Sequence, residues 1–468
     1  MKTIKRRDFL KLAGAGVGLL AGPLSAAERS SQKRPDILFV FTDQQRADML
    51  SSAGNKYVKT PAMDSVGANG ARFEQAYCAN PVCAPSRFSM MTGVMPSRIG
   101  MEDNADIQKK VPGEILEQSL GWVFRNAGYE TAYGGKVHLP MTLEQIGFDC
   151  ISQDERRGLA DACAAFLRRK HERPFLLVAS FINPHDICYM AINANGKKPY
   201  YTKELSNAQK LPEGVSRQEF LEKICPPLPP NFEIPQGEPE GVTQVDPRRF
   251  RFYVREHWGE EDWRLHRWAY CRLTEVVDAE IGTVLRALRE AGLEESTLVV
   301  FSSDHGDLDA THRLEHKSVL YEEAMRVPFV VSWKGVTKPG LVDSDHLVST
   351  GLDLIPTLCD FAGITPPKGL TGRSVRPLAE GRKPDSWRDL LVVESKHSRA
   401  IRTGRFKYTV YDVGEHREAL GDLEKDPGEM KNLAGDPAFI NVLEKHRKIL
   451  RKCMEETGDK VADRYIVQ

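Results

Sequence analysis

Three short segments of the chain combine residue types that serve nucleophilic and metal-assisted chemistry. Residues 83–87 read Cys-Ala-Pro-Ser-Arg, residues 42–46 read Thr-Asp-Gln-Gln-Arg, and residues 303–307 read Ser-Asp-His-Gly-Asp. A cysteine before a helix-like stretch can be a thiol nucleophile with a lowered pKa, although a buried core cysteine is the commoner case. Carboxylates beside an amide oxygen suit a hard divalent cation such as calcium, whereas lone Asp residues usually cap helices or lie in solvated loops.

Four further residues could hold an anion or move a proton. They are Lys136 and His138 in the segment 135–139, His185 in the segment 183–186, and Lys317 in the segment 312–317. Lysine supplies a point charge, and histidine changes its charge near neutral pH. His312 and His316 lie close to Lys317 in the sequence. Because a lone histidine is more often structural than catalytic, each is as consistent with packing as with a pocket.

Apolar runs of strand length precede most of these residues. Such runs lie at 36–41, 175–181, 297–303 and 328–333, and helical patterns lie at 114–127, 158–169, 262–292 and 351–362. Strands that alternate with helices predict an α/β fold with a mostly parallel sheet covered on both faces. Because the chemistry of such sheets gathers beyond the carboxyl ends of the strands, the residues that follow the strands are expected to meet there.

Two segments depart from this alternation. Residues 188–250 are rich in Pro, Gly and Lys and are predicted to form a long irregular excursion. Beyond Pro384, strand-like runs at 390–395 and 400–411 and a helical segment at 436–454 predict a small terminal unit.

The segment 83–87 resembles the modification signature of the type I sulfatases, whose cysteine is oxidised to the aldehyde formylglycine. Residues 91–98 resemble the second signature of that family, with Val94 where an arginine is usual, and the resemblance continues to 422–433. It implies the fold of the alkaline phosphatase superfamily: a large mixed sheet flanked by helices, and a small C-terminal antiparallel sheet with a helix. The corresponding domains are a catalytic one at 36–383 and a small one at 384–468.

The resemblance also implies a role for each candidate residue. A hydrated aldehyde carries two hydroxyls on one carbon, so one can attack sulfur and the other can later release sulfate. The family's metal ligands correspond to Asp43, Gln44, Cys83, Asp304 and His305. Its catalytic residues correspond to Cys83, Arg87, Lys136, His138, His185 and Lys317.

Two of these positions vary within the family. Gln44 stands where many members carry Asp, and His305 stands where many carry Asn. Calcium is the expected cation, and magnesium or manganese stays open because a histidine nitrogen is a softer ligand. The two lysines would bind sulfate, His138 would hold the hydrate or take its proton, and His185 would lie by the leaving oxygen. Formation of the aldehyde implies a formylglycine-generating or anaerobic sulfatase-maturing enzyme as partner.

The first 27 residues have the character of an export signal. Arg6 and Arg7 precede a short Gly-rich apolar run and small residues ending at Ala27, which resembles a twin-arginine signal peptide. We therefore expect a periplasmic or secreted protein without a stable membrane anchor. Cleavage after Ala27 would remove five basic residues and one acidic residue and leave a net charge of −4.

Charge and cysteine content limit the other classes of function. Lys+Arg and Asp+Glu number 65 each, so no basic excess points to nucleic acid. The nine cysteines are scattered and match neither a zinc site nor a dense disulfide framework.

Two alternatives use the same fold. One is a phosphonate monoester or phosphodiester hydrolase with the same aldehyde, and the other is a binding protein in which Cys83 stays a thiol. Sulfated glycans, aryl sulfates and choline sulfate all present the same group to Cys83. The export signal and the basic segment at 246–253 favour a sulfated saccharide as the hypothesis.

Overall fold

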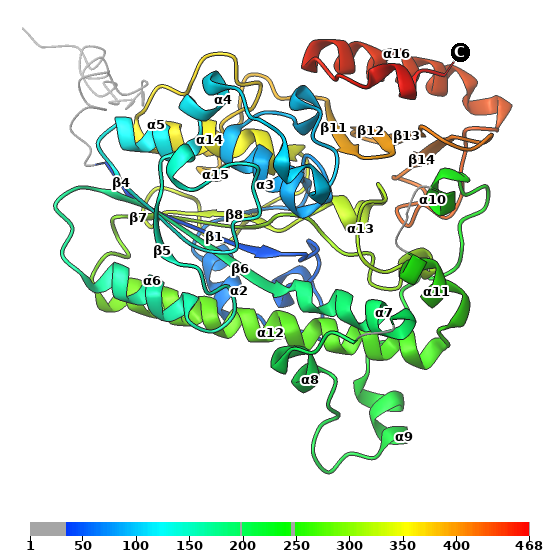
Figure 1. Ribbon diagram of the computed structural model, residues 1–468, viewed down its shortest axis with the longest axis horizontal. Helices are drawn as coiled ribbons and strands as arrows, with labels where there is room; N and C mark the ends of the chain where they lie inside the picture. Colours follow the sequence, from blue (N-terminus) through cyan, green and yellow to red (C-terminus); the bar gives the residue numbers. More distant parts are fainter. Residues whose placement is uncertain (1–33, 197–198, 245–248, 468) are drawn as a thin grey trace, which may run out of the picture. The chain divides into compact units, whose positions relative to one another are not determined.

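Strand β1 (Asp36–Asp43) runs through the middle of an eight-stranded sheet and carries the first candidate metal ligand to the sheet edge (Figure 1). The computed structural model describes residues 34–467 except 197–198 and 245–248, so the predicted signal peptide at 1–27 lies outside the described residues. The strand order is β5-β4-β6-β1-β7-β8-β2-β9. The strands are β5 (Asp149–Ser152), β4 (Glu130–Gly135), β6 (Phe175–Pro184), β1, β7 (Thr297–Ser303), β8 (Phe329–Ser332), β2 (Ala71–Phe73) and β9 (Leu341–Asp343).

The sheet is mixed but mainly parallel, as the alternation in the sequence predicts. β1 pairs in parallel with both β6 and β7, and β4 pairs in parallel with β5 and β6. β8 is antiparallel to β7 and to β2. Because β1 and β7 run side by side in the same direction, their carboxyl ends reach the same edge of the sheet.

Helices cover both faces of this sheet, and alternate residues of β1 contact the two helical layers. Leu38 and Val40 pack with α2 (Pro61–Ala68), α6 (Leu159–Arg168) and α12 (Glu260–Glu290). Phe39 and Phe41 pack on the opposite face with α3, α4, α5 and α14, whose bounds are Cys83–Thr92, Gly113–Glu117, Leu120–Asn126 and Thr350–Ala362. The period of two along β1 therefore divides the core between the layers.

The small terminal unit is a four-stranded antiparallel sheet with one helix against it (Figure 1). The strands are β11 (Leu390–Ser395), β12 (Ser398–Thr403), β13 (Phe406–Tyr411) and β14 (Glu418–Asp422), and the helix is α16 (Ile440–Thr457). The backbone N–H of Glu394 donates to the carbonyl of Ala79, and the Ser395 hydroxyl donates to the carbonyl of Ser318. The end of β11 thus contacts the loop that precedes Cys83 and the loop that contains Lys317. Residues 35–468 form one compact unit, within which the contacts draw no boundary. The predicted division at 383/384 therefore stays a prediction.

Two details of the predicted elements were wrong. The helix expected at 114–127 is two helices, since the backbone of Ser119 between them is extended. The strand expected over 400–411 is the hairpin of β12 and β13.

The excursion at 188–250 was also less irregular than predicted. Its helices are α7 (Cys188–Asn195), α8 (Lys203–Ala208), α9 (Arg217–Glu219), a π-helical turn at Phe220–Ile224, α10 (Gly241–Gln244) and α11 (Arg249–His257). None of these described helices exceeds nine residues, which is too short for a periodic pattern to identify.

The remaining elements are short. A two-stranded parallel sheet joins β3 (Ala76–Tyr77) to β10 (Val348–Ser349), and α13 (Glu322–Met325) and α15 (Arg376–Ala379) are single turns. Among the described helices, none combines the length and the hydropathy that a membrane span requires.

Candidate active site

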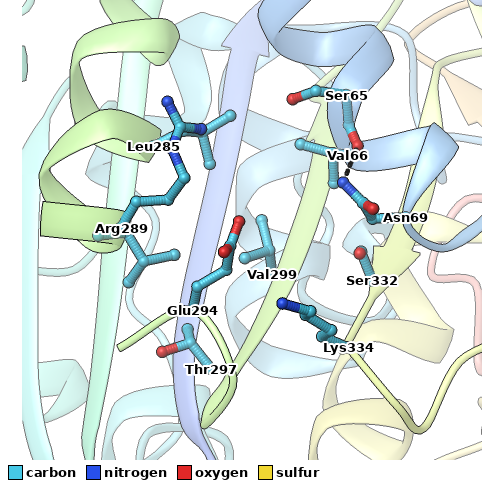
Figure 2. Close-up of a pocket in the computed structure, with 11 residues that line it drawn as sticks. Ser65, Val66, Asn69, Leu285, Arg289, Glu294, Thr297, Val299, Ser332 and Lys334 are labelled. Atoms are coloured by element: carbon cyan, nitrogen blue, oxygen red, sulfur yellow. Dashed lines mark hydrogen bonds between the residues drawn. The ribbon is translucent and has the colours of Figure 1, made fainter. Parts of the chain in front are cut away.

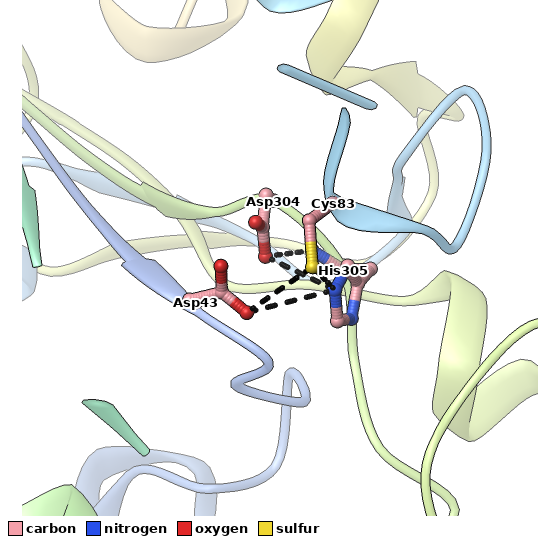
Figure 3. A group of neighbouring side chains, drawn as sticks. All are labelled: Asp43, Cys83, Asp304 and His305. Carbon is pink, nitrogen blue, oxygen red and sulfur yellow. Dashed lines mark hydrogen bonds and ion pairs between the residues drawn. The ribbon is translucent and has the colours of Figure 1, made fainter. Parts of the chain in front are cut away.

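Asp43, Cys83, Asp304 and His305 converge at the carboxyl edge of the large sheet (Figure 3). β1 ends with Asp43, and Asp304 follows the end of β7, where Thr42 pairs with Ser303. Cys83 is the first residue of α3 and points at the same spot. One ligand atom from each of the four residues lies within 4.8 Å of the others, and all four side chains are buried. The three segments identified in the sequence therefore do form one site.

The chemistry of this donor set fits a divalent cation. Two carboxylates and an imidazole lie together, and burial and the neighbouring Asp43 charge raise the pKa of Asp304 to about 6. A cation held between Asp43 and Asp304 would offset that repulsion and keep both carboxylates ionised. Asp43, Gln44, Cys83, Asp304 and His305 are the residues that would hold it.

Arg87 bridges the two carboxylates from α3, four residues after Cys83. Its Nε donates to Asp304 Oδ2 at 2.8 Å, and its Nη2 donates to Asp43 Oδ2 at 2.9 Å. Its Nη1 donates to the Lys136 carbonyl at 2.8 Å and to Ser180 Oγ at 2.7 Å. A single planar guanidinium thus fixes two strand ends relative to the helix that begins at Cys83.

Two lysines surround Cys83 with positive charge. Lys317 Nζ lies 2.9 Å from Cys83 Sγ and 3.0 Å from His305 Nε2, and Lys136 Nζ lies 2.7 Å from Asp43 Oδ2. Burial and the Asp43 charge act to raise the pKa of the Cys83 thiol, but Lys136, Lys317 and His305 outweigh them and hold it well below its usual value. Burial likewise opposes ionisation of Asp43, and the surrounding cations keep its pKa well below the usual range. The site favours anions.

The amide of Gln44 can point in only one direction. Its Nε2 donates to Asp307 Oδ2 at 2.6 Å, and its Oε1 accepts from Lys317 Nζ at 2.9 Å. A carboxylate only accepts and an ammonium only donates, so the reversed amide would face both partners wrongly. Asp307 therefore directs the Gln44 oxygen towards Lys317, whose Nζ also lies 3.0 Å from His305 Nε2. We did not predict this role from sequence, although Asp307 lies three residues after Asp304 in the same segment.

The histidines divide into those near Cys83 and one elsewhere. Burial and the Lys136 charge lower the pKa of His185, and the Asp43 charge acts in the opposite direction. His316 Nδ1 lies 3.3 Å from Gln44 Nε2. His312 instead stacks on Tyr321 at 3.9 Å, and burial and nearby cations lower its pKa to about 3. Of the two uncertain histidines, His316 lies in the site and His312 has a packing role.

His138 and the basic segment complete the candidates. His138 follows β4, is half-buried and has a φ of 45°; its Nδ1 has no hydrogen-bond partner among the described residues. Among the described residues, no hydrogen bond joins His138 to Cys83. In the segment 246–253, residues 246–248 lie outside the described residues, and the side chains of 249–251 do too.

A hollow in the molecule lies away from this site. It is lined by Val66 of α2, Leu285 and Arg289 of α12, and Thr297 at the start of β7 (Figure 2). Thr297 begins β7 and Asp304 follows its end, so the hollow opens near the amino ends of the strands. No candidate catalytic residue lines it.

Comparison with known proteins decides the family. The family model described as Sulfatase matches residues 35–364. The chain belongs to the sulfatase family. A second model, described as N-sulphoglucosamine sulphohydrolase, C-terminal, matches residues 310–456 of the sulfatase.

Similar proteins match this sulfatase over nearly its whole length. A delta 4,5-hexuronate-2-O-sulfatase of Bacteroides thetaiotaomicron is 30% identical over 466 residues, which cover 93% of this chain and 92% of that protein. An ulvan-active sulfatase of Formosa agariphila is 28% identical, with coverage of 93% and 84%. The structure of a 2-O GAG sulfatase superposes with a TM-score of 0.79 at 28% identity, with coverage of 92% and 94%. The protein is a sulfuric ester hydrolase with the predicted fold, and its family implies a divalent metal.

Proposed function

We propose that this sulfatase removes sulfate from a sulfated saccharide, using an aldehyde made from Cys83 and a bound cation, in the first place calcium. The observation that carries the proposal is the setting of Cys83. Its Sγ is buried, lies 2.9 Å from Lys317 Nζ and 3.4 Å from His305 Nε2, and marks the position from which the aldehyde oxygen would project. Cationic groups thus surround the point where an anionic ester would react.

The side chains around Cys83 have complementary tasks in this proposal. The aldehyde hydrate would supply one hydroxyl to attack sulfur and a second whose deprotonation releases sulfate, which a thiol or a serine could not do. The cation would offset the charge of the sulfate. Lys136 and Lys317 would bind sulfate oxygens, His185 would protonate the leaving alcohol oxygen, and His138 would take the proton of the hydrate.

The nature of the ligands supports calcium. Asp43, Asp304 and the directed Gln44 oxygen are hard donors. His305 is the softer ligand, so magnesium and manganese belong in the same test. Protein freed of metal by a chelator and then titrated with each cation separately should bind calcium most tightly, and equal or tighter binding of manganese would contradict the assignment.

Two kinds of observation support a saccharide and an exported enzyme. The similar proteins are described as acting on hexuronate, ulvan and GAG substrates. Residues 1–27 have the composition of a twin-arginine signal, and processing by a maturing enzyme would precede export. Replacing Arg6 and Arg7 together by Lys should keep the protein in the cytoplasm; unchanged export would exclude that route.

Mass spectrometry of one tryptic peptide tests the aldehyde. The peptide 73–87 contains both Cys78 and Cys83, so Cys78 is an internal control. After production with a sulfatase-maturing enzyme and alkylation, we expect one alkylated cysteine and a Cys83 residue that has lost the elements of hydrogen sulfide and gained an oxygen atom. Two alkylated cysteines would mean that Cys83 remains a thiol, which is the outcome that the binding-protein alternative requires.

A substrate panel tests the ester and the saccharide. Matched aryl sulfate and aryl phosphonate esters compare the two ester classes, and a set of sulfated oligosaccharides and choline sulfate compares the alcohols. We expect desulfation of at least one oligosaccharide and a higher kcat/KM for sulfate than for phosphonate. Activity confined to choline sulfate would refute the saccharide.

A further inference from the structure

A row of aromatic rings leads from His185 to the surface. The rings of His185 and Tyr189 are 6.1 Å apart and nearly perpendicular, and the rings of Tyr189 and Tyr200 are stacked at 5.3 Å with an interplanar angle of 10°. Tyr200 is 57% exposed and its neighbour Tyr201 is 78% exposed. These two are the most exposed large hydrophobic side chains of the described part of the chain. An aromatic surface that begins at a catalytic histidine calls for a ligand rather than a packing partner.

The backbone holds this row in place. The turn His185–Ile187 leads directly into α7 (Cys188–Asn195), so Tyr189 lies one helical turn after His185. The Asn193 side chain then fixes Tyr200 from both sides: its Nδ2 donates to the Tyr200 carbonyl at 2.8 Å, and its Oδ1 accepts from the Tyr200 N–H at 2.7 Å. Tyr200 therefore presents its ring from a fixed backbone although the ring is largely in solvent.

The inner end of the row belongs to the catalytic site. His185 directly follows Pro184, the β6 residue that pairs with Asp43 of β1, and burial and the Lys136 charge lower its pKa. Tyr189 is half-buried and lies three residues after Asp186, which accepts from Arg156 Nη2 at 2.9 Å. Tyr200, at the outer end of the row, lies one ring beyond Tyr189. A sugar that carries the reacting sulfate would therefore contact His185 before it could contact Tyr200.

We propose that Tyr189 and Tyr200 form a subsite that binds a sugar ring next to the sulfated one, so that the preferred substrate is a sulfated oligosaccharide rather than a monosaccharide. The inference rests on the proposed function and extends it outward from the sulfate. A pyranose presents an apolar C–H face and a rim of hydroxyls. Tyrosine matches it with a flat apolar face and a polar tip, and a tyrosine loses little conformational entropy when it is fixed.

Binding and turnover together test the subsite. In a Cys83→Ala background, which cannot turn over, Tyr200→Ala should weaken the binding of a sulfated oligosaccharide roughly tenfold, since an aromatic contact contributes up to about 1.5 kcal/mol. Tyr200→Phe keeps the ring and should bind like the parent. Tyr57→Ala removes another partly exposed tyrosine, 37% exposed, and should have no effect.

In the active enzyme, the same Tyr200→Ala change should raise KM for the oligosaccharide and leave its kcat within about twofold. Its kcat and KM for a small aryl sulfate should stay unchanged. Equal binding by the Tyr200→Ala and parent proteins, or equal losses on both substrates, would overturn the subsite. If the unmutated, matured enzyme hydrolysed no sulfate ester, the proposed function would be overturned instead. The comparison of oligosaccharide binding by the Tyr200→Ala and parent proteins would still test the subsite.

Discussion

Replacement of Arg87 by Lys isolates the contribution of the guanidinium fork, because the charge is kept and the geometry is lost. Arg87 donates four hydrogen bonds of 2.7 to 2.9 Å, to Asp304, Asp43, the Lys136 carbonyl and Ser180. A lysine ammonium is a single point with three donors, so it cannot reach both carboxylates from the same position. Asp43 would keep its ion pair with Lys136, whereas Asp304 would lose its only described salt bridge to an arginine.

The magnitude follows from the bonds that are lost. A net hydrogen bond to a charged group contributes roughly 1.5–3 kcal/mol, and a buried acceptor left without its donor costs a further 1–3 kcal/mol. We therefore expect Arg87→Lys to lower the free energy of unfolding by about 3 kcal/mol or more. Because Arg87 also orients two candidate metal ligands, the affinity for a divalent cation should fall about 10- to 100-fold.

Urea unfolding and calorimetric metal titration measure the two effects separately. Unfolding is followed in chelator, so that metal binding does not add to the stability of the folded state. Arg168→Lys is the matched control, since Arg168 forms an exposed ion pair with Glu290 at 2.8 Å and should change stability by less than about 1 kcal/mol. If Arg87→Lys unfolds like this control and binds metal like the parent, the guanidinium fork does not position the metal ligands.

Three further changes probe the site and the small sheet. Lys317→Met should lower kcat/KM for an aryl sulfate about 10²- to 10³-fold, with exposed Lys452→Met as a control; a loss below tenfold would remove Lys317 from sulfate binding. Asp307→Ala should let the Gln44 amide rotate and weaken cation binding about 10- to 100-fold in a titration, and unchanged affinity would contradict its orienting role. Burial raises the pKa of Glu394 to about 7 from 4.5. Protonated Glu394 therefore stabilises the folded state fully below pH 4.5, and this stabilisation is lost as the pH rises through 7. Glu394→Gln should therefore stabilise the protein by roughly 3 kcal/mol at pH 8 and not at pH 4, as measured by urea unfolding; an equal effect at both pH values would contradict this assignment.

Local sequence already contains much of the site. The carboxylates Asp43 and Asp304 directly follow apolar runs, and parallel strands end at one edge, so their meeting could be expected without coordinates. The role of the segment 83–87 could be predicted because its five residues together resemble a signature that is specific to one family. The short helices of 188–250 escaped detection because a periodic pattern needs more residues than each of them has.

The sequence by itself determined the residue types at Cys83, Asp43 and Asp304, the strands that end beside them, and the family. Only the tertiary structure decided how Lys317 reaches Cys83, 234 positions away, and which way the Gln44 amide faces between Lys317 and Asp307. It also decided that Tyr189 and Tyr200 extend from His185 to solvent. The physical reason is that residue type and spacing are local properties, whereas an amide orientation, a charge balance or a row of rings depends on atoms that the strand order brings together from distant segments.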